Sequence, residues 1–586
     1  MADPIQHVTE ETLNDIARYG VLAGGLDYSP AALAVARGLL AAAQGTAGVE
    51  LPPEFRQLVD SVRGIATVEI GYVPMPDGVQ LSTVLINQNA GGQRPLVVVP
   101  AGWSPYGWLP FVWTYLTLAA EGYHVLAYTP RGLGDPALPS TSGGFIDVGG
   151  PQDRADATYL LTHTYGKLDI SKVGFLGESY GSGISQLVAA HDSRVSVVVA
   201  LSTWGSLATS LYDNGTRHLA ALRALVGFTG GPVTEKFDPE TRALLEDFEA
   251  GRNMEAVIEW ALDRSPEHFL ALTNKLDVPT FMSNTWHETL FPVNQLLDTF
   301  THLTVPKQLN LWIGDHGAPE GAGLVGVPTG IAFPGLLTPM QEARNWLRHY
   351  LTEDGDAPET GVRNQIMFTY RTQPVPGGGQ RIIEPATRER QSCWGENTRT
   401  ERWYLADGVP DCALGDKADA GWERNFRAGN ETQARATDTP LLQTGQREWY
   451  GTPKVYRLDD FERDQLLIWL TDSLPEGRRL RGAPTVKLTV RSPETTASFV
   501  AYLFDVAADN TAHLITHEPY TVDRLTPEEN RTIEWRLQAA CYDLPEGHRL
   551  ALVVNSRDLL YSYAGGGTTT VGSLATAESY LDLTLG

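Results

Sequence analysis

The sequence predicts an α/β core that is interrupted by a helical insertion, preceded by a short helical segment and followed by an all-β domain. Short apolar runs without polar alternation recur between residues 96 and 313, with helical patterns between some of them. A helix-rich stretch at about 206–277 lies between two of these runs. After about residue 360 the helical period fades, and strand-like runs separated by Gly, Pro and Asp follow.

Length and charge narrow the classes of function. The chain has 586 residues with 45 Lys and Arg against 70 Asp and Glu, a formal net charge of −25. Its length suits several domains, and 42% hydrophobic residues is an ordinary globular composition. Such a negative surface repels phosphate backbones and anionic lipid, so we expect neither nucleic acid nor a membrane as partner. A homo-oligomer is compatible with the sequence.

The cysteines and the first residues bear on location. Cys393, Cys412 and Cys541 match no metal spacing, so we expect no disulfide framework, no zinc and no other cofactor. The start at 1–7 lacks the basic and apolar regions of a signal peptide. We therefore expect a cytoplasmic protein, although a secreted chain that has lost its leader would have the same sequence.

Residues 1–66 are expected to form the N-terminal helical segment. One amphipathic run begins at Thr9, and a second begins at Ser29, a good N-cap followed by Pro30 at the first helical position. Residues 67–205 form the first part of the predicted core. They open with a hairpin around Pro76-Asp77-Gly78.

The runs after this hairpin are typical of strands buried on both faces of a parallel sheet. They lie at 96–99, 124–128, 173–176 and 197–201, with helices expected at 153–165 and 180–191. The insertion at 206–277 is predicted to be a helical cap, with helix starts at Asp238-Pro239-Glu240 and Ser265-Pro266-Glu267. Residues 278–360 complete the core, and 361–586 form a β-sandwich or jelly-roll domain.

The strongest motif is Gly177-Glu178-Ser179-Tyr180-Gly181, between an apolar run and a helix-compatible run. In that context Gly-x-Ser-x-Gly is the nucleophile elbow of an α/β-hydrolase core, which exposes the serine hydroxyl at the carboxyl edge of the sheet. Only glycine fits two positions before and after the serine, because the neighbouring backbone crowds there. We therefore predict Ser179 as a nucleophile.

A serine nucleophile needs a base and an orienting acid, in the chain order Ser, acid, His. His316 follows the last core run, and Glu288 is the only carboxylate of the loop at 284–292. We predict these two as base and acid, with Asp298 or Asp315 as alternative acids. His287-Glu288 also begins a zincin-like motif, but position 291 is Phe where a second His is required.

The oxyanion of an acyl-transfer intermediate requires two N–H donors. We expect one from the amide of Tyr180 and the other from the loop after the 96–99 run, where Trp103 offers an amide or indole N–H and Tyr106 a hydroxyl. Tyr106, Trp108 and Trp286 are predicted to line the substrate pocket together with the cap helices. Packing of these aromatic residues in the core is the competing interpretation.

The order of these motifs resembles the peptidase S15 group, which includes Xaa-Pro dipeptidyl-peptidases, cocaine-esterase-like acyl esterases and α-amino acid ester acylases. The resemblance covers about 67–586 and lies in Gly-Glu-Ser-Tyr-Gly at 177–181, the Thr129–Asp135 segment and the late strand at 549–556. It implies Ser179 as nucleophile, Glu288 as acid, His316 as base and the Tyr180 amide in the oxyanion hole.

Three positions depart from the family pattern. Glu288 stands where the family has Asp, Trp103 where it has the oxyanion tyrosine, and Asp135 where it has Ser. The sequence therefore predicts a cofactor-independent serine hydrolase acting on a small-molecule ester or amide, or on a short peptide. The alternatives are a Xaa-Pro dipeptidyl-peptidase and, in another class, a catalytically inert binding protein with the same fold.

Overall fold

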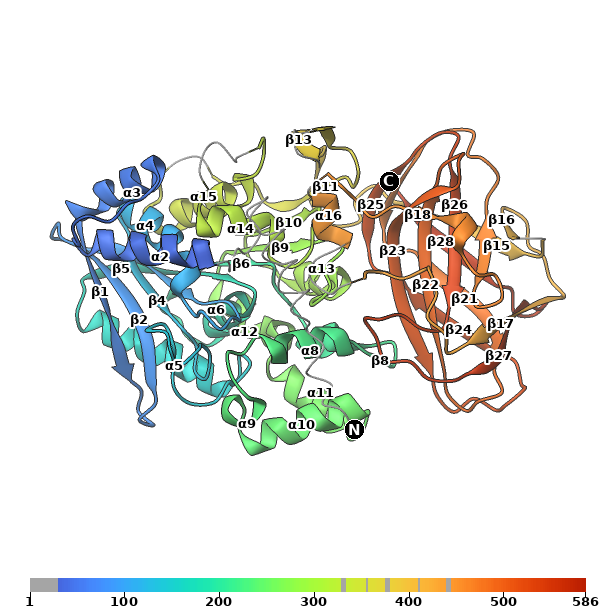
Figure 1. The fold of residues 1–586 in the computed structure, drawn as a ribbon, viewed down its shortest axis with the longest axis horizontal. Coiled ribbons are helices and arrows are strands. Elements are labelled where there is room, and N and C mark those ends of the chain that lie inside the picture. The colour runs from blue at the N-terminus through green and yellow to red at the C-terminus, as the bar shows by residue number, and fades with distance from the viewer. Residues whose placement is uncertain are drawn as a thin grey trace.

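The structure is a computed structural model that describes residues 30–327, 333–354, 357–374, 380–408, 411–438, 444–449 and 451–586. Figure 1 shows a mixed sheet with helices at one end of the molecule, an all-β domain at the other end, and a group of helices between them along one side. The predicted helix starts at Thr9 and Ser29 lie outside the described residues. None of the described helices has the length and apolar character needed to cross a membrane.

The core is a ten-stranded sheet with the strand order β1-β2-β4-β3-β5-β6-β9-β10-β11-β14. In this order the strands from β4 to β11 run parallel to one another, and β1, β2 and β14 add antiparallel pairs at the edges. The bounds are β1 (Ala66–Pro74), β2 (Gln80–Gln88), β3 (Arg94–Pro100), β4 (His124–Tyr128), β5 (Ile170–Glu178), β6 (Val195–Leu201), β9 (Thr280–Thr285), β10 (Lys307–Trp312), β11 (Gly361–Gln365) and β14 (Arg388–Gln391).

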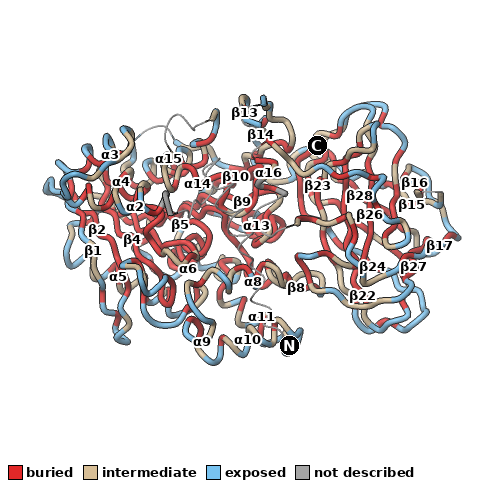
Figure 2. Tube along the Cα trace, in the orientation of Figure 1, coloured by how far each residue is buried: buried red, intermediate tan, exposed pale blue. Residues whose placement is uncertain are grey.

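The central strands are apolar throughout because helices cover both faces of the sheet. In β3, Val97 and Val99 belong to one buried cluster, and Leu96 and Val98 belong to another. Helices α4 (Val112–Ala120) and α15 (Thr338–Thr352) contribute to the first cluster, whereas α5 (Pro151–Tyr165) and α6 (Tyr180–His191) contribute to the second. Figure 2 shows this continuous buried interior. The predicted parallel α/β core is confirmed.

The N-terminal helices extend one of these layers. Helix α2 (Pro30–Ala43) begins at the predicted proline, and α3 (Pro53–Arg63) buries Phe55, Val59 and Val62 on one face. Both helices pack against α4 and share its apolar cluster. This segment therefore extends the helical layer formed by α4 on one face of the core sheet.

The insertion at 206–277 contains the helices between β6 and β9. They are α7 (Leu207–Leu211), α8 (Leu219–Gly227), α9 (Val233–Lys236), α10 (Pro239–Ala250), α11 (Met254–Leu262), the short 3-10 helix η3 (Pro266–Phe269) and α12 (Leu270–Leu276). Asp238 caps α10 as predicted, because its carboxylate accepts from the N–H groups of Glu240 and Thr241. Ser265 does not act as a cap, because its hydroxyl donates to Ala261 O on the preceding helix.

Two short strands that follow residue 360 join the core sheet. Strand β11 pairs in parallel with β10, and β14 adds to it antiparallel, so both complete the core sheet. The all-β domain then begins at β15. Sequence pattern alone does not separate these short strands from those of the next domain, since the pairing is decided by contacts distant in the chain.

The C-terminal domain is a largely antiparallel fourteen-stranded β structure, as the predicted jelly roll requires. In β22, Ala501 and Leu503 face one buried cluster, while Tyr502 and Phe504 face another. The strands are β15 (Arg399–Ala406), β16 (Cys412–Gly415), β17 (Trp422–Ala428), β18 (Tyr456–Arg457), β19 (Leu467–Leu470), β20 (Arg478–Gly482), β21 (Thr485–Arg491), β22 (Ala497–Val506), β23 (Thr511–Val522), β24 (Arg531–Arg536), β25 (Ala540–Leu544), β26 (Arg549–Asn555), β27 (Gly567–Ser573) and β28 (Tyr580–Leu585).

The two domains meet through specific polar contacts. Helix α13 (Val293–His302) supplies Asn294, whose side chain donates to Leu537 O and whose N–H donates to the side chain of Gln538. Asp298 of the same helix pairs with Arg536 at 2.6 Å. Helix α13 directly follows the loop that holds Glu288. By contacting α13, the β domain supports the end of the loop on which the predicted acid lies.

We predict that Gly177→Ala destabilises the fold, whereas Gly71→Ala does not. A Cβ at position 177 would lie 2.1 Å from the backbone of Gly181, whereas at position 71 in β1 it would meet nothing within 4 Å. Forcing an extra methyl group into packed backbone costs about 1–3 kcal/mol of unfolding free energy. Denaturant unfolding of the two variants measures the difference, and equal unfolding free energies would contradict this account of the elbow.

Candidate active site

Ser179 lies at the sharp turn between β5 and α6 with φ 52° and ψ −120°. This left-handed conformation is strained for a residue with a side chain and is typical of a functional turn. Gly181 permits the turn, because a Cβ there would lie 2.1 Å from Pro100 O at the end of β3. The elbow predicted from the sequence is therefore present in the structure, with Ser179 at the N-terminus of a helix.

The structure brings Ser179, His316 and Glu288 together. His316 Nε2 lies 2.7 Å from Ser179 Oγ, and His316 Nδ1 lies 3.0 Å and 3.1 Å from the two carboxylate oxygens of Glu288. Glu288 follows β9 and His316 follows β10, so the parallel sheet places both loops at the edge where β5 ends. The glutamate carboxylate is fixed because it also accepts from the N–H groups of Leu290 and Phe291.

The two alternative acids lie elsewhere. Asp298 forms its ion pair with Arg536 of the β domain. Asp315 is buried and accepts from the N–H and hydroxyl of Thr289 and from the N–H of His316. It therefore ties the acid loop to the histidine loop, whereas the imidazole Nδ1 contacts Glu288.

The imidazole of His316 is held in a strongly acidic surrounding. Burial by itself lowers the pKa of His316, but the charge of Glu288 and the hydrogen bond to it, followed by the charges of Glu178 and Asp315, outweigh burial and raise that pKa to about 9. Charge development on the imidazole is therefore favoured, and the geometry suits proton transfer from Ser179.

Tyr180 and Trp103 are the two residues expected to donate N–H groups to the oxyanion. Tyr180 begins α6, where the first N–H groups of a helix have no intrahelical acceptor. The loop containing Trp103 lies beside the elbow, since a Cβ on Gly102 would lie 3.4 Å from Glu178 O. The indole N–H of Trp103 donates to Leu225 O of the cap at 2.7 Å, which leaves its backbone amide as the donor to consider.

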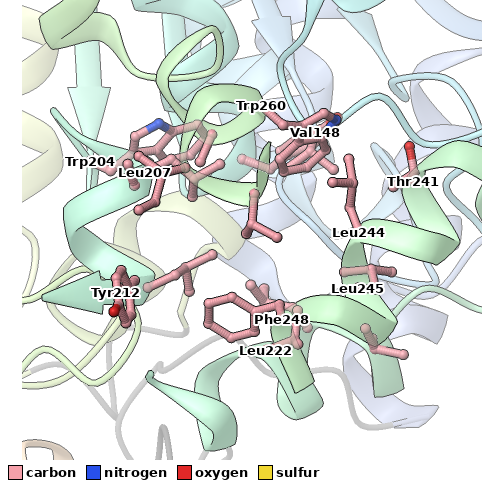
Figure 3. A pocket seen from close by; sticks show the side chains of 18 of the residues that line it. Val148, Trp204, Leu207, Tyr212, Leu222, Thr241, Leu244, Leu245, Phe248 and Trp260 are labelled. Atoms are coloured by element: carbon pink, nitrogen blue, oxygen red, sulfur yellow. The ribbon is translucent and has the colours of Figure 1, made fainter. Parts of the chain in front are cut away.

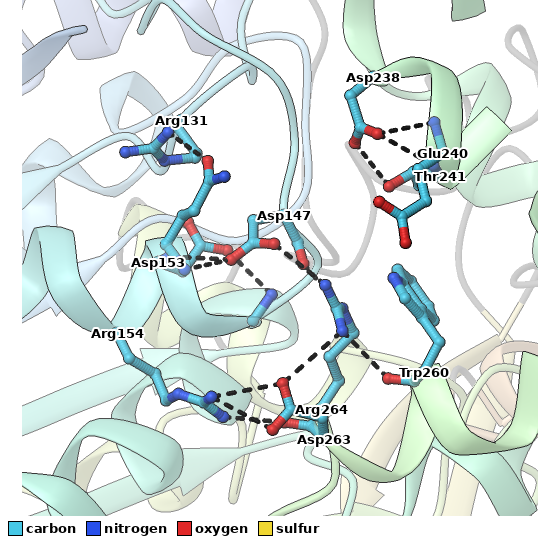
Figure 4. A network of polar contacts seen from close by, with 12 residues as sticks. Arg131, Asp147, Asp153, Arg154, Asp238, Glu240, Thr241, Trp260, Asp263 and Arg264 are labelled. Carbon is cyan, nitrogen blue, oxygen red and sulfur yellow. Dashed lines mark hydrogen bonds and ion pairs between the residues drawn. The ribbon is translucent and has the colours of Figure 1, made fainter. Parts of the chain in front are cut away.

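The side chain of Tyr180 is anchored by a buried polar network that includes Asp153, and Figure 4 shows Asp153, Asp147 and Arg264 of this network. Its hydroxyl donates to Asp153, and it accepts from the N–H of Gly149 at 3.0 Å. Asp147 accepts from the N–H groups of residues 152 and 153 and pairs with Arg264, which follows cap helix α11. The network therefore connects the residue after the serine with the base of the cap.

A cavity of about 80 Å³ opens beside Ser179 beneath the cap (Figure 3). Trp103 and Tyr180 form part of its wall, with their rings edge to face and centroids 5.1 Å apart. The cap supplies most of the rest, including Leu222 and Leu225 from α8, Leu244, Leu245 and Phe248 from α10, and Trp260 from α11. The lining contains no Asp, Glu, Lys, Arg or His among the described residues. It is therefore suited to an uncharged, apolar group.

Three predicted pocket residues lie outside this cavity. Trp108 is fully buried in the core, where its indole N–H donates to Ser82. Tyr106 packs against the same cluster as the N-terminal helices. Trp286 turns away from the serine, and its indole N–H donates to Gln365 O at 2.7 Å. Trp108 and Trp286 are buried and their indoles have hydrogen-bond acceptors, whereas Tyr106 is partly buried at the edge of its cluster, so packing explains all three.

Sequence reasoning did not single out most of the cap residues that form the cavity wall. The signal was partly present, because Leu244, Leu245 and Phe248 share one face of the predicted helix α10. The sequence does not show what the apolar face of α10 contacts, because that contact depends on how the cap folds back over the sheet. Among the described residues no group of three or more His, Cys, Asp or Glu is placed to hold a metal ion.

Comparison with known families agrees with this architecture. The model of the X-Pro dipeptidyl-peptidase (S15) family matches residues 77–318, and that of the X-Pro dipeptidyl-peptidase C-terminal non-catalytic domain matches residues 361–578. No curated protein matches the chain.

Solved structures share the fold at low sequence identity. An aminopeptidase from the marine sediment archaeon Thaumarchaeota archaeon is 15% identical with a TM-score of 0.64, covering 89% of this chain and 96% of its own. A CocE/NonD family hydrolase from Staphylococcus aureus is 11% identical with the same TM-score, covering 89% and 94%. An α-amino acid ester hydrolase is 16% identical with a TM-score of 0.62, covering 89% and 97%. The chain therefore carries a peptidase S15 domain at 77–318, with an α/β-hydrolase fold, and the C-terminal non-catalytic domain of X-Pro dipeptidyl-peptidases at 361–578.

Proposed function

We propose that this protein is a serine hydrolase that cleaves esters of apolar acyl groups through an acyl-enzyme intermediate. The observation that carries the proposal is the distance of 2.7 Å between Ser179 Oγ and His316 Nε2, with Glu288 on the other imidazole nitrogen. This arrangement has the nucleophile, base and orienting acid that acyl transfer requires. The peptidase S15 domain supports a hydrolase.

In the proposed reaction Ser179 Oγ attacks the ester carbonyl while its proton passes to His316 Nε2. The imidazolium, stabilised by Glu288, returns that proton to the leaving alcohol as the carbon–oxygen bond breaks, which leaves the acyl group on Ser179. A water molecule then attacks the acyl-enzyme by the same proton route. The acid and free enzyme are released.

The oxyanion of each tetrahedral intermediate is proposed to accept from the backbone N–H groups of Tyr180 and Trp103. Support comes from the position of Tyr180 at the start of α6, where the helix dipole favours negative charge, and from the packing of the Trp103 loop against the elbow. Asp153 holds the Tyr180 side chain, so this donor is fixed before the substrate arrives.

The cavity favours an ester with an apolar acyl group over a dipeptide. A Xaa-Pro substrate carries an ammonium group, and burying it without a carboxylate partner is costly. The cavity wall offers leucine, valine and aromatic side chains, and the described residues place no carboxylate there. A preference for Xaa-Pro anilides over hydrophobic acyl esters would contradict this assignment of the substrate class.

We predict that a fluorophosphonate probe labels Ser179 and that Ser179→Ala abolishes both labelling and ester hydrolysis. The variant removes the attacking oxygen and leaves the glycines of the elbow in place. Mass spectrometry of the labelled peptide and turnover of a chromogenic butyrate ester provide the measurements. Ser498→Ala is the matched control, since this buried hydroxyl of β22 contacts Thr521 in the β domain. Absence of labelling in the unmodified protein would favour the inert binding protein.

We predict that kcat/KM for ester hydrolysis rises with pH, with a midpoint above the usual histidine value. The base must be neutral to accept a proton, and the pKa of His316 is raised to about 9. Glu288→Gln removes the largest charge that raises this pKa, so its midpoint moves to lower pH and its maximal rate falls. Asp298→Asn is the control with an unchanged midpoint. A shift in Asp298→Asn alone would contradict the assignment of the acid.

We predict that Leu245→Trp selects against long acyl chains. The larger ring fills part of the cavity, so octanoyl esters lose kcat/KM while acetyl esters retain it. The expected loss is about fourfold for each methylene that is excluded, from about 0.8 kcal/mol per buried methylene. Leu272→Trp, on the exposed side of α12, is the control. Equal losses of kcat/KM for short and long esters would show that the acyl chain of the substrate does not occupy this cavity.

A further inference from the structure

Glu178 is a buried acid that directly precedes the proposed nucleophile Ser179. The proposed reaction assigns no role to this acid. It is the last residue of β5 and is 2% exposed. Its Oε1 has no hydrogen-bond partner among the described residues. Its Oε2 lies against the loop after β3, since a Cβ on Gly102 would approach it to 2.6 Å.

The other buried acids around His316 are bound differently. Glu288 contacts the imidazole and two backbone N–H groups. Glu320, on α14 (Ala318–Val325), accepts from the hydroxyls of Ser202 and Ser283. Asp315 accepts from Thr289. Among these four acids, Glu178 is the one whose buried Oε1 meets no donor and whose carboxylate makes no hydrogen bond to the side chains and N–H groups that hold the others in the described residues, so structural hydrogen bonds do not explain its placement.

The titratable groups that face Glu178 come from two loops and one helix. They are His316 after β10, Glu320 on α14 and Glu288 after β9. Burial first, and then the charges of Glu320 and Glu288, raise the pKa of Glu178 to about 7, against the opposing effect of His316. A positive charge on His316 therefore favours the ionised form of Glu178.

We propose that Glu178 is a second positioning acid for His316, whose buried carboxylate stabilises the imidazolium formed during attack by Ser179. The inference rests on the proposed serine-hydrolase function. Two carboxylates then act on the imidazole from different elements, Glu288 through a direct hydrogen bond and Glu178 through charge across a buried space. Charge interactions are strong there because little water screens them.

Gly102 is part of the same arrangement. A side chain at this position would displace the carboxylate of Glu178, because the Cβ itself would come within 2.6 Å of Oε2. The glycine therefore permits the acid to lie against the loop that carries Trp103. In this way the loop proposed to supply an oxyanion donor and the acid that acts on the base are packed directly together.

The test is the pH dependence of fluorophosphonate labelling at Ser179 in Glu178→Gln. The amide has the same shape and lacks the charge, so the midpoint of the labelling rate moves to lower pH by about one unit, a tenfold change in the equilibrium. Glu518→Gln is the matched control, a buried acid of β23 bound to Gln538, and its midpoint stays that of the unmodified protein. An unchanged midpoint in Glu178→Gln would overturn the proposal.

A second measurement does not depend on activity. A carboxyl whose pKa is raised by folding loses native stability as pH rises from its unfolded value toward its folded one. The melting temperature of the unmodified protein should therefore fall more between about pH 5 and pH 8 than that of Glu178→Gln. Equal changes in melting temperature for the two proteins would show that folding does not raise the pKa of Glu178.

The two proposals fail in different ways. If the unmodified protein is not labelled at any pH, the serine-hydrolase function fails, while the melting comparison still reports on the buried acid. If labelling occurs and the midpoint of Glu178→Gln equals that of the unmodified protein, the triad stands and the role of Glu178 falls.

Discussion

The site depends on the close approach of two backbones at the elbow. Gly177 and Gly181 let the end of β5 and the start of α6 come into contact with each other and with the end of β3. This contact holds Ser179 in a left-handed conformation, which directs its hydroxyl toward His316. Glu288 and His316 lie close to this turn, because the loops that carry them begin where β9 and β10 end, at the same edge of the sheet.

A second constraint is the burial of charge around one imidazole. Glu288, Glu178 and Asp315 all act on His316 from elements that the sheet brings to one edge. Burial in a space with little water raises the pKa values of Glu178 and Asp315, and the charges of the acids raise the pKa of the imidazole. The charges of these acids favour positive charge on the imidazole, and perturbed pKa values of this kind cluster at functional sites.

The cap and the β domain divide the remaining tasks. The cap provides an apolar wall next to Ser179 and is fastened to the core by Arg264 and Asp147 beneath Tyr180. The β domain supports α13 through Asn294 and Asp298, and so holds the loop of the acid. The proposed substrate cavity and the contacts among Ser179, His316 and Glu288 thus depend on different parts of the chain.

The sequence by itself determined the parallel core, the cap, the elbow and the order of the candidate residues, because these follow from local patterns of apolar residues, glycine and proline. Only the tertiary structure decided that Glu288 rather than Asp298 meets His316, and that Trp108 and Trp286 pack away from the serine. Those outcomes depend on which segments distant in the chain come into contact. A buried indole takes whichever apolar space and acceptor the fold provides, and no local pattern specifies that choice.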